Sequence, residues 1–370
     1  MKILFFFILV LALPAYAVDV EPLDIGASAP TFSLQGVDGK TYSLNDFEDD
    51  EILVVIFTAN HCPTAQAYED RMIELVNDYN DEDVAVVAIS SNHPPAVRLD
   101  ELGYSDLGDT FDDMKIRAKH KGYNFPYLYD GDTQEMAMAY GPQATPHVFI
   151  FDNKRKLRYE GRFDDTENPY VEVKTKDVRN AIDALLAGET IPVPSTKVFG
   201  CSMKWAEKVE WVERGNEEWQ AQPVNVEMID STGIVQLMKN PSENLLLVNV
   251  WATWCGPCVV EFPELVNIYR MYSGRGFDML TISADKPAQR DKVLEFLEEQ
   301  HAAFRNVHFN STDVYALIDA VDPEWPGALP HTLLVEPGGN VLYRHTGLID
   351  PLTVKRKIVE VLGRYYADNK

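Results

Sequence analysis

Cysteine is scarce in this chain of 370 residues. It occurs four times, at Cys62, Cys201, Cys255 and Cys258. So few cysteines in so long a chain exclude a small fold held together mainly by disulfides. They also disfavour a structural zinc site, because zinc takes four ligands and only Cys255 and Cys258 are closely spaced. We therefore expect neither a metal ion nor a cofactor, and interpret each cysteine in its local sequence.

Positive charge is also in short supply. The chain has 33 lysines and arginines against 58 aspartates and glutamates, which gives a formal net charge of -25 at pH 7. An acidic surface repels the phosphate backbone of nucleic acids, so we expect no nucleic-acid partner. The sequence also contains no phosphate-binding loop, metal-ligand cluster or hydrolase triad spacing.

Long apolar runs are absent beyond the N-terminus. There, Lys2 is followed by an apolar run over 3–13 and then by small residues that end at Ala17. This order predicts a secretory signal peptide over 1–17, cleaved after Ala17. The run is shorter than the roughly 20 residues of a membrane-spanning helix, so we expect no stable membrane insertion after cleavage. Export predicts a periplasmic location, where disulfides form and persist.

An internal repeat runs through the remaining sequence. Each half has an apolar run ahead of a cysteine, then a stretch of helical pattern, then a second apolar run. These stretches are 53–58, 64–79 and 84–90 in the first half, and 245–251, 258–272 and 277–283 in the second. Short, continuous apolar runs are typical of buried parallel strands, so each half predicts a strand–helix–strand unit.

The repeat continues towards the end of each half. Pro146-His147 and Pro330-His331 each introduce a further apolar run. Short strands are then predicted over 157–160 and 341–345, and closing helices over 177–186 and 353–366. With 46% hydrophobic residues, a chain of this length can bury two cores. We predict an α/β fold of two tandem domains, each a mixed central sheet flanked by helices, and interpret His147 and His331 as packing residues.

A proline-rich break separates the two halves at 191–195. It predicts a first domain over 18–190, a linker over 191–222 that contains Cys201, and a second domain over 223–370. Residues 204–219 are charged and rich in tryptophan. Their pattern is compatible with a helix that belongs to either domain.

Cys255-Gly256-Pro257-Cys258 lies at the junction of a predicted strand and a predicted helix. The positive end of the helix dipole and the unpaired amides there favour a thiolate at the first cysteine. Two intervening residues let one helical turn bring the sulfurs together, and proline is tolerated in a first turn. A purely structural disulfide closing so small a loop would add little stability, so we predict a dithiol that cycles.

The segment from Trp254 to Cys258 is followed by Glu261, Phe262 and Pro263. In these residues the second half resembles the thioredoxin superfamily and, within it, the exported TlpA and ResA type. The resemblance covers roughly 224–365. It implies that Cys255 is the attacking thiolate, that Cys258 is the resolving thiol and that Pro330 is a cis-proline facing them. It also implies that Glu261, one helical turn after Cys258, exchanges a proton with the dithiol.

The first half, from Ile25 to about Trp205, resembles the redoxin branch related to peroxiredoxins. The resemblance rests on the turn at 36–40 and on Cys62-Pro63-Thr64. Ala65 stands where the second cysteine of the dithiol would be, so Cys62 forms no local disulfide. The peroxiredoxin frame also places a threonine three residues before its cysteine, whereas Thr58 lies four before Cys62. Both halves together predict two tandem thioredoxin-like domains.

Cys201 follows the proline-rich break, in Phe199-Gly200-Cys201-Ser202. Related redoxin sequences resemble this chain in ending with a Gly-Cys-Ser segment, which favours a redox pair of Cys62 and Cys201. A purely structural disulfide and a buried thiol remain alternatives. His61, next to Cys62, is interpreted as a neighbour that stabilises a thiolate.

We predict an exported thiol-disulfide oxidoreductase that reduces protein disulfides through Cys255 and Cys258. Its partners would be protein disulfides or thiols, and the resemblance suggests a membrane thiol reductase as electron donor. One alternative is a peroxide-reducing relay through Cys62 and Cys201 that the dithiol recharges. Another is a first domain that only docks a client for the second.

Overall fold

A computed structural model describes residues 20–365, so the predicted signal peptide lies outside the described residues. The first half contains a seven-stranded sheet with the order β2-β1-β5-β4-β3-β7-β8. Its strands are β1 Ser33–Gly36, β2 Thr41–Ser43, β3 Ile52–Phe57, β4 Val84–Ser90, β5 Tyr127–Tyr129, β7 His147–Phe151 and β8 Leu157–Gly161. Its helices are α1 Pro63–Asp78, α2 Phe111–Lys121, α3 Glu135–Tyr140 and α4 Asp177–Leu186, with short 3-10 turns η1 Leu44–Phe47, η2 Pro94–Ala96 and η3 Leu99–Tyr104.

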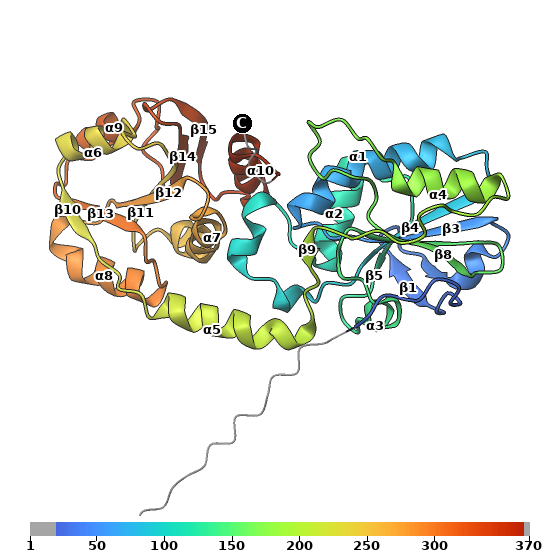
Figure 1. Cartoon of the computed structure of the whole chain (residues 1–370). Helices are drawn as coiled ribbons and strands as arrows, with labels where there is room; N and C mark the ends of the chain where they lie inside the picture. Colours follow the sequence, from blue (N-terminus) through green and yellow to red (C-terminus); the bar gives the residue numbers. More distant parts are fainter. Residues whose placement is uncertain (1–19, 366–370) are drawn as a thin grey trace, which may run out of the picture.

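The second half contains a six-stranded sheet with the order β10-β13-β12-β11-β14-β15. Its strands are β10 Glu227–Ile229, β11 Leu245–Trp251, β12 Phe277–Ser283, β13 Arg305–Phe309, β14 His331–Val335 and β15 Val341–Thr346. Its helices are α6 Ser231–Met238, α7 Gly256–Tyr272, α8 Arg290–Glu299, α9 Val314–Val321 and α10 Pro351–Leu362, with a 3-10 turn η5 Pro287–Gln289. Figure 1 shows the two halves side by side, each with helices around its sheet.

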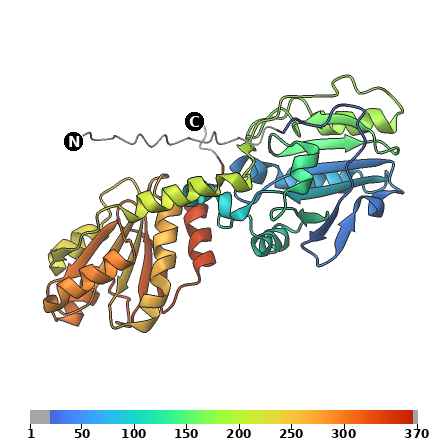
Figure 2. The same ribbon diagram turned by 90° about the horizontal axis from the view of Figure 1, so that it is seen from below.

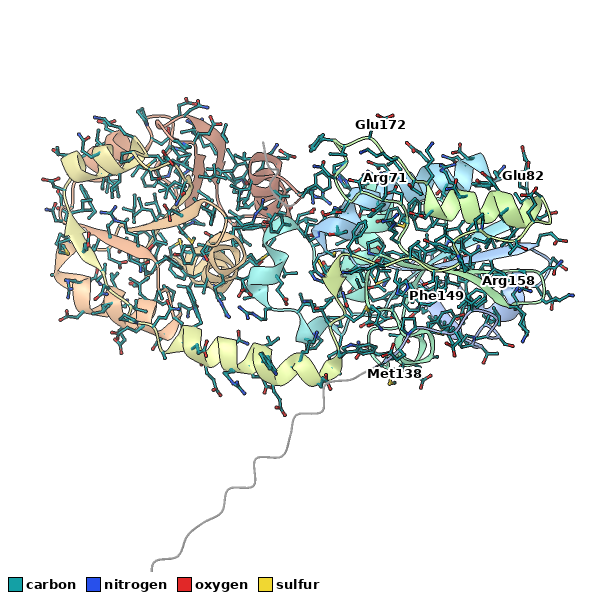
Figure 3. All side chains as sticks on the ribbon, in the orientation of Figure 1. Arg71, Glu82, Met138, Phe149, Arg158 and Glu172 are labelled. Carbon is teal, nitrogen blue, oxygen red and sulfur yellow. A yellow bond between two sulfur atoms is a disulfide. The ribbon has the colours of Figure 1, made fainter. Side chains whose placement is uncertain are left out.

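The centre of each sheet follows the same plan. β3 pairs parallel to β4 and antiparallel to β7, and β11 pairs parallel to β12 and antiparallel to β14. Every residue of β3 and β11 is buried, as expected for strands covered on both faces. Phe149, labelled in Figure 3, lies on β7 within the core, whereas Glu82 and Glu172 lie on the outside. The predicted mixed sheets flanked by helices, in two tandem thioredoxin-like units, are confirmed.

One predicted helix ends earlier than the sequence pattern indicated. The closing helix was expected over 353–366, but α10 begins at Pro351 and ends at Leu362. Asp350 caps its start by accepting a hydrogen bond from the Thr353 amide. Gly363 adopts a positive φ of 85° immediately after the last turn, which is a backbone conformation that favours glycine and terminates helices.

The charged stretch over 204–219, which the sequence assigned to neither half, is helical from Ala206 onward and contacts both halves. It contains a short turn η4, Ala206–Lys208, and helix α5, Val209–Gln220, none of whose residues is fully buried. Figure 2 shows α5 running from one half to the other. At its far end the Trp219 indole donates to the carbonyl of His301 and packs against Tyr269, while η2 of the first half contacts α5. The helix therefore bridges the halves.

The halves also pack directly on each other, through η3 and the end of α7. Gly103 lies so close to α7 that a Cβ atom there would be 2.7 Å from the carbonyl oxygen of Met271. The Tyr272 hydroxyl donates to the carbonyl of Ser105 at 2.7 Å, and Arg275 donates to the carbonyl of Gly103. The segment 103–106 of the first half is therefore held against the second half.

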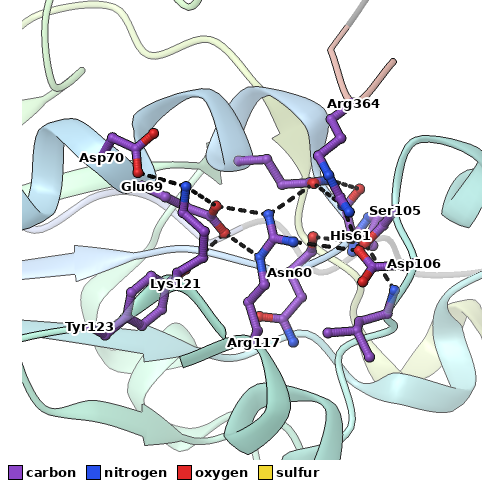
Figure 4. A network of polar contacts seen from close by, with 12 residues as sticks. Asn60, His61, Glu69, Asp70, Ser105, Asp106, Arg117, Lys121, Tyr123 and Arg364 are labelled. Atoms are coloured by element: carbon purple, nitrogen blue, oxygen red, sulfur yellow. Dashed lines mark hydrogen bonds and ion pairs between the residues drawn. The ribbon is translucent and has the colours of Figure 1, made fainter. Parts of the chain in front are cut away.

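Asp106 is the centre of the ionic contacts across this interface. Its side chain is fully buried and lies within 3.0 Å of Arg356 and 2.5 Å of Arg364 from the second half. Arg117 of the first half lies 3.5 Å away, and Arg364 also donates to the side chain of Gln66. Figure 4 shows this network around Asp106 and Arg117. Three guanidinium groups thus converge on one buried carboxylate.

Candidate active site

Cys255 and Cys258 are joined by a disulfide in the structure, with an S–S distance of 2.05 Å and Cα atoms 5.3 Å apart. Cys255 is the N-cap of α7, and the amide of Cys258 donates to its sulfur at 3.3 Å. The pair therefore lies where the helix dipole and the unpaired amides stabilise a negative sulfur. Cys255 is 6% exposed and Cys258 is fully buried, so the first sulfur is the more accessible of the two.

Two loops frame this disulfide. The Leu329-Pro330 peptide bond is cis and leads into β14, which pairs with β11 just ahead of Cys255. On the other side, Asp285 accepts hydrogen bonds from the amide and hydroxyl of Thr253 and so fixes the approach to the cysteine. A cavity of about 500 Å³ opens beside them. Its lining includes Trp254, Asp285, Phe309, Trp325 and Leu329.

Glu261 lies on α7 one turn after Cys258 and is almost completely buried. Its two carboxylate oxygens accept hydrogen bonds from the Asn249 side chain at 2.9 Å and from the Ile349 amide at 3.0 Å. Burial raises the pKa of Glu261 above its ordinary value, and these two hydrogen bonds offset only part of that effect. The carboxyl therefore keeps its proton to a higher pH than an exposed glutamate would.

The histidines after the two cis-prolines are packed rather than exposed, as the sequence predicted. His147 contacts Glu160 at 2.9 Å and accepts a hydrogen bond from the amide of Gln143. His331 is fully buried against Asp322, and burial lowers its pKa despite that carboxylate. Neither side chain is available to a partner in this arrangement.

Cys62 occupies the corresponding position in the first half. It is the N-cap of α1, and the amide of Ala65 donates to its sulfur at 3.4 Å. The Cys62 thiol donates to the carbonyl of Thr145, whose bond to Pro146 is cis. Unlike Cys255, Cys62 is fully buried. The structure therefore retains the helix-end site of a thioredoxin-like domain but closes it to solvent.

Cys201 lies directly beside Cys62, although it is far away in the sequence. It belongs to the short strand β9, Cys201–Ser202, which pairs antiparallel with β6, Ala144–Thr145. Gly200 permits this approach, because a Cβ atom there would be 2.1 Å from the carbonyl oxygen of Thr145. Cys201 hydrogen-bonds to the Cys62 sulfur and is partly exposed. Both cysteines are thiols in the structure, positioned to pair.

His61 connects Cys62 to a buried carboxylate. Its Nδ1 lies 2.6 Å from Oδ2 of Asp109, and both side chains are buried. Asp109 also accepts hydrogen bonds from the amides of Asn60 and His61 and from the side chain of Asn92. Four donors on one carboxylate favour its ionised form. Asp109 in turn favours protonated His61, because a neutral ring would leave the negative charge less well compensated.

The electrostatics of this cluster act on the Cys62 sulfur. Burial raises the pKa of the Cys62 thiol, but the hydrogen bond from Cys201, the charge of His61 and the hydrogen bond from the Ala65 amide lower it to about 6. The pKa of His61 lies above its ordinary value, since the attraction of Asp109 outweighs the opposing effect of burial. The surroundings of Cys62 therefore favour its thiolate against the effect of burial.

The model of the AhpC/TSA family matches residues 25–160 and 220–344, which together make up well over half of the sequence. The chain belongs to the AhpC/TSA family. Because the family matches twice, once in each half, this AhpC/TSA chain is a tandem protein of the thioredoxin superfamily. The two matched segments contain nearly all of the two sheets, and all of α5 except its last residue lies between them.

Several curated relatives of this AhpC/TSA protein are named thiol-disulfide oxidoreductase ResA. The relative from Oceanobacillus iheyensis is 28% identical over 140 residues, which cover 38% of this chain and 67% of the relative. The relative from Bacillus subtilis is 29% identical over 102 residues, 28% of this chain and 52% of the relative. The chain thus spans between about half and two thirds of the length of these relatives.

Solved structures are similar too. The crystal structure of an uncharacterised conserved protein from Geobacillus kaustophilus is 38% identical, with a TM-score of 0.44, and covers 49% of this chain and 92% of its own. Among residues 20–365, no helix of this AhpC/TSA protein is long and apolar enough to cross a bilayer. In the same range, no group of three or more histidine, cysteine or acidic side chains could hold a metal ion.

Proposed function

We propose that this protein is an exported thiol-disulfide oxidoreductase whose exchange centre is the pair Cys255 and Cys258. The observation that carries the proposal is the disulfide between Cys255 and Cys258 at the start of α7. The names of the curated relatives support the same chemistry. Export rests on the sequence of residues 1–17.

The exchange takes place in two steps. In the reduced protein, the Cys255 thiolate attacks one sulfur of a client disulfide, and the other client sulfur leaves as a thiolate. Cys258 then attacks the Cys255 sulfur of the mixed disulfide, so that the second client sulfur is released and the disulfide of the protein forms again. The more exposed sulfur makes the first contact, and the fully buried one resolves it.

Glu261 would serve the resolving step. Cys258 must lose its proton before it attacks, and Glu261 lies one helical turn away on the same face of α7. Its raised pKa brings the carboxyl closer to the pH at which a proton can be exchanged. Pro330 would position the client strand next to Cys255, and the cavity beside Trp254 would receive client side chains.

The substrates would be protein disulfides, with a membrane thiol reductase as electron source. A glycine and a proline between the cysteines match thioredoxin, whose potential is about -270 mV. We expect the Cys255–Cys258 couple to equilibrate near that value in dithiothreitol buffers, with the fraction of disulfide measured by mass spectrometry after alkylation. A potential near -120 mV, as in a strong oxidant, would contradict the reducing direction.

Cys62 and Cys201 provide a second candidate function, a separate thiol pair in the first half. Their hydrogen bond and the pairing of β6 with β9 favour it over a first half that only docks clients. A peroxide-reducing relay recharged by Cys255 and Cys258 fits less well. The dithiol lies at the start of α7, whereas the end of α7 faces the segment next to Cys62, and a helix of this length spans about 25 Å.

Oxidation of the full chain with glutathione disulfide tests the second candidate. We expect peptide mapping to recover Cys62 joined to Cys201 and Cys255 joined to Cys258, with no crossed pair. In the proposed domain limits, Cys201 belongs to the linker over 191–222. Strand β9 of that linker pairs with β6 of the first half, so we expect Cys201 to pair within the first half. Recovery of both Cys62 and Cys201 as thiols, while Cys255 and Cys258 are fully oxidised, would eliminate this function.

A further inference from the structure

The two sulfurs of the first half differ in access. Cys62 is fully buried among Ala59, Ala65 and the carbonyl of Thr145, whereas Cys201 is partly exposed. The chain just before Cys62 is tied to the interface with the second half, because Ser105 donates to the carbonyl of Asn60 and accepts the hydroxyl of Tyr272 at its own carbonyl. An external sulfur atom therefore meets Cys201 first.

Cys201 keeps some exposure to solvent, whereas Cys62 has none, and a cavity lies next to the strand that carries Cys201. A cavity of about 530 Å³ adjoins β9 between α5 and the first half. Ser202, the neighbour of Cys201, lines it together with Ala96, Lys204 and Trp211. Trp211 is largely exposed on α5, so the cavity has an apolar wall at its entrance. Cys201 itself is not part of this lining, because neighbouring side chains of a strand point to opposite faces, so its access depends on its own partial exposure.

The two sulfurs also differ in how well they hold negative charge. Cys62 receives the amide of Ala65 at the start of α1, and the charge of the neighbouring His61, which is paired with Asp109, lowers the pKa of its thiol. A sulfur of low pKa is the better leaving group when a disulfide opens. Cleavage of a Cys62–Cys201 disulfide would therefore favour release of Cys62 as the thiolate and leave Cys201 bonded to the attacking sulfur.

We infer that Cys201 is the sulfur that exchanges with an external protein dithiol or disulfide, and that Cys62 is the buried sulfur that opens and closes the internal disulfide. The inference rests on the proposed pairing of Cys62 with Cys201. It reverses the usual order of a thioredoxin-like site, in which the cysteine at the start of the helix meets the client. His61 and Asp109 are positioning residues for the Cys62 thiolate.

The exchange is balanced without any further reactant. In the reducing direction, a thiolate of the external dithiol attacks the Cys201 sulfur, the bond to Cys62 breaks, and its electron pair stays on Cys62. The second external thiol, once deprotonated, attacks the external sulfur of the mixed disulfide, so Cys201 leaves as a thiolate and the external disulfide forms. In the reverse direction, Cys201 attacks an external disulfide and the Cys62 thiolate then attacks Cys201.

Trapping with glutathione disulfide distinguishes the two sulfurs. Two full-length variants carry Cys255→Ser and Cys258→Ser, and in addition either Cys62→Ser or Cys201→Ser, so that each retains one thiol. We expect the native chain with Cys201 alone to form the mixed disulfide at least about tenfold faster than the chain with Cys62 alone. The direction of this difference in rate is informative. If the fraction of thiolate alone set the rate, Cys62 would react readily at pH 7.

The possible results distinguish our assignment of Cys201 from the Cys62–Cys201 pairing on which it rests. If the mapped oxidised chain contains the Cys62–Cys201 disulfide but Cys62 is trapped faster, the pair stands and our assignment of Cys201 is overturned. If that disulfide never forms, both are overturned. Denaturation in urea should make the two single-thiol chains react at similar rates, which shows that access in the folded state sets the difference.

A second readout tests the role of His61. Titration of the Cys62 thiolate by its ultraviolet absorption, in the chain that retains this thiol alone, should move to higher pH when His61→Gln is added. His331→Gln is the matched control, because His331 is also buried against a carboxylate but lies in the other half. An unchanged titration midpoint in His61→Gln would show that His61 does not position the Cys62 thiolate. The trapping experiment would still decide which cysteine exchanges with the external sulfur.

Discussion

Cys258→Ser is expected to accumulate mixed disulfides with client proteins, whereas Cys255→Ser is expected to lose exchange almost entirely. The reason is the order of contact set by the fold. Cys255 is the more accessible sulfur and caps α7, while Cys258 is buried one turn behind it. Removing the attacking sulfur should lower the rate of disulfide reduction by about three orders of magnitude or more. The rate can be followed with a disulfide-bonded protein substrate and excess dithiothreitol, after subtraction of the uncatalysed reaction.

Cys62→Ser is the matched control for this experiment. It removes a cysteine from the equivalent helix end of the first half and leaves the second half untouched. Its rate should stay within about twofold of that of the unaltered chain, since about 25 Å of helix separates the two sites. Equal losses in Cys62→Ser and Cys255→Ser would contradict an exchange centre confined to the second half. Exchange that persists in Cys255→Ser would do the same.

Much of the fold could be predicted because its elements depend on local pattern. The apolar runs around Val54 and Val248 are uninterrupted, and runs of that kind require burial on both faces of a sheet. The repeated positions of Pro146 and Pro330 then fixed how the two halves correspond, and both peptide bonds are cis. The end of α10 was placed too late because its apolar spacing continues past Gly363, where the backbone turns.

The site could be predicted where its residues are neighbours in the chain and not where the fold assembles them. Cys255, Cys258 and Glu261 lie within the first two turns of one helix, so their spacing in the sequence already predicts how their side chains lie relative to one another. Asp109 reaches His61 from a loop that begins after η3, and no spacing in the sequence indicates that contact. The position of Cys201 beside Cys62 depends on β9 returning to Thr145, which only the tertiary structure determines.

The interface between the halves was not predicted from sequence for the same reason. Its arginines stand at the end of the chain, within and just after α10, and their partner Asp106 lies in the first half. A buried carboxylate requires compensation, because taking its charge out of water costs several kcal/mol. Burial raises the pKa of Asp106, yet Arg364, Arg117 and Arg356 together hold it below its ordinary value. Asp106 therefore remains charged and keeps the three guanidinium groups together.

Asp106→Ala is expected to destabilise the chain by about 2–3 kcal/mol, because it leaves the partly buried guanidinium groups of Arg356 and Arg364 without their carboxylate, while Arg117 keeps its pair with Glu69. Urea unfolding at pH 7 measures the change, and Asp100→Ala is the control. Asp100 also pairs with an arginine, but both side chains are about half exposed, so its loss should cost less than about 1 kcal/mol. Equal effects of the two substitutions would show that Asp106 does not hold the halves together.

The same carboxylate predicts how stability depends on pH. A folded-state pKa below the ordinary value of 3.8 means that the contribution of Asp106 is fully present above that value and is lost as the pH falls through the lowered pKa. Between neutral pH and acid, the unaltered chain should therefore lose more stability than Asp106→Ala, and the two unfolding curves should converge. A gap between the curves that stays constant down to the acid limit would assign the loss in Asp106→Ala to packing instead of charge.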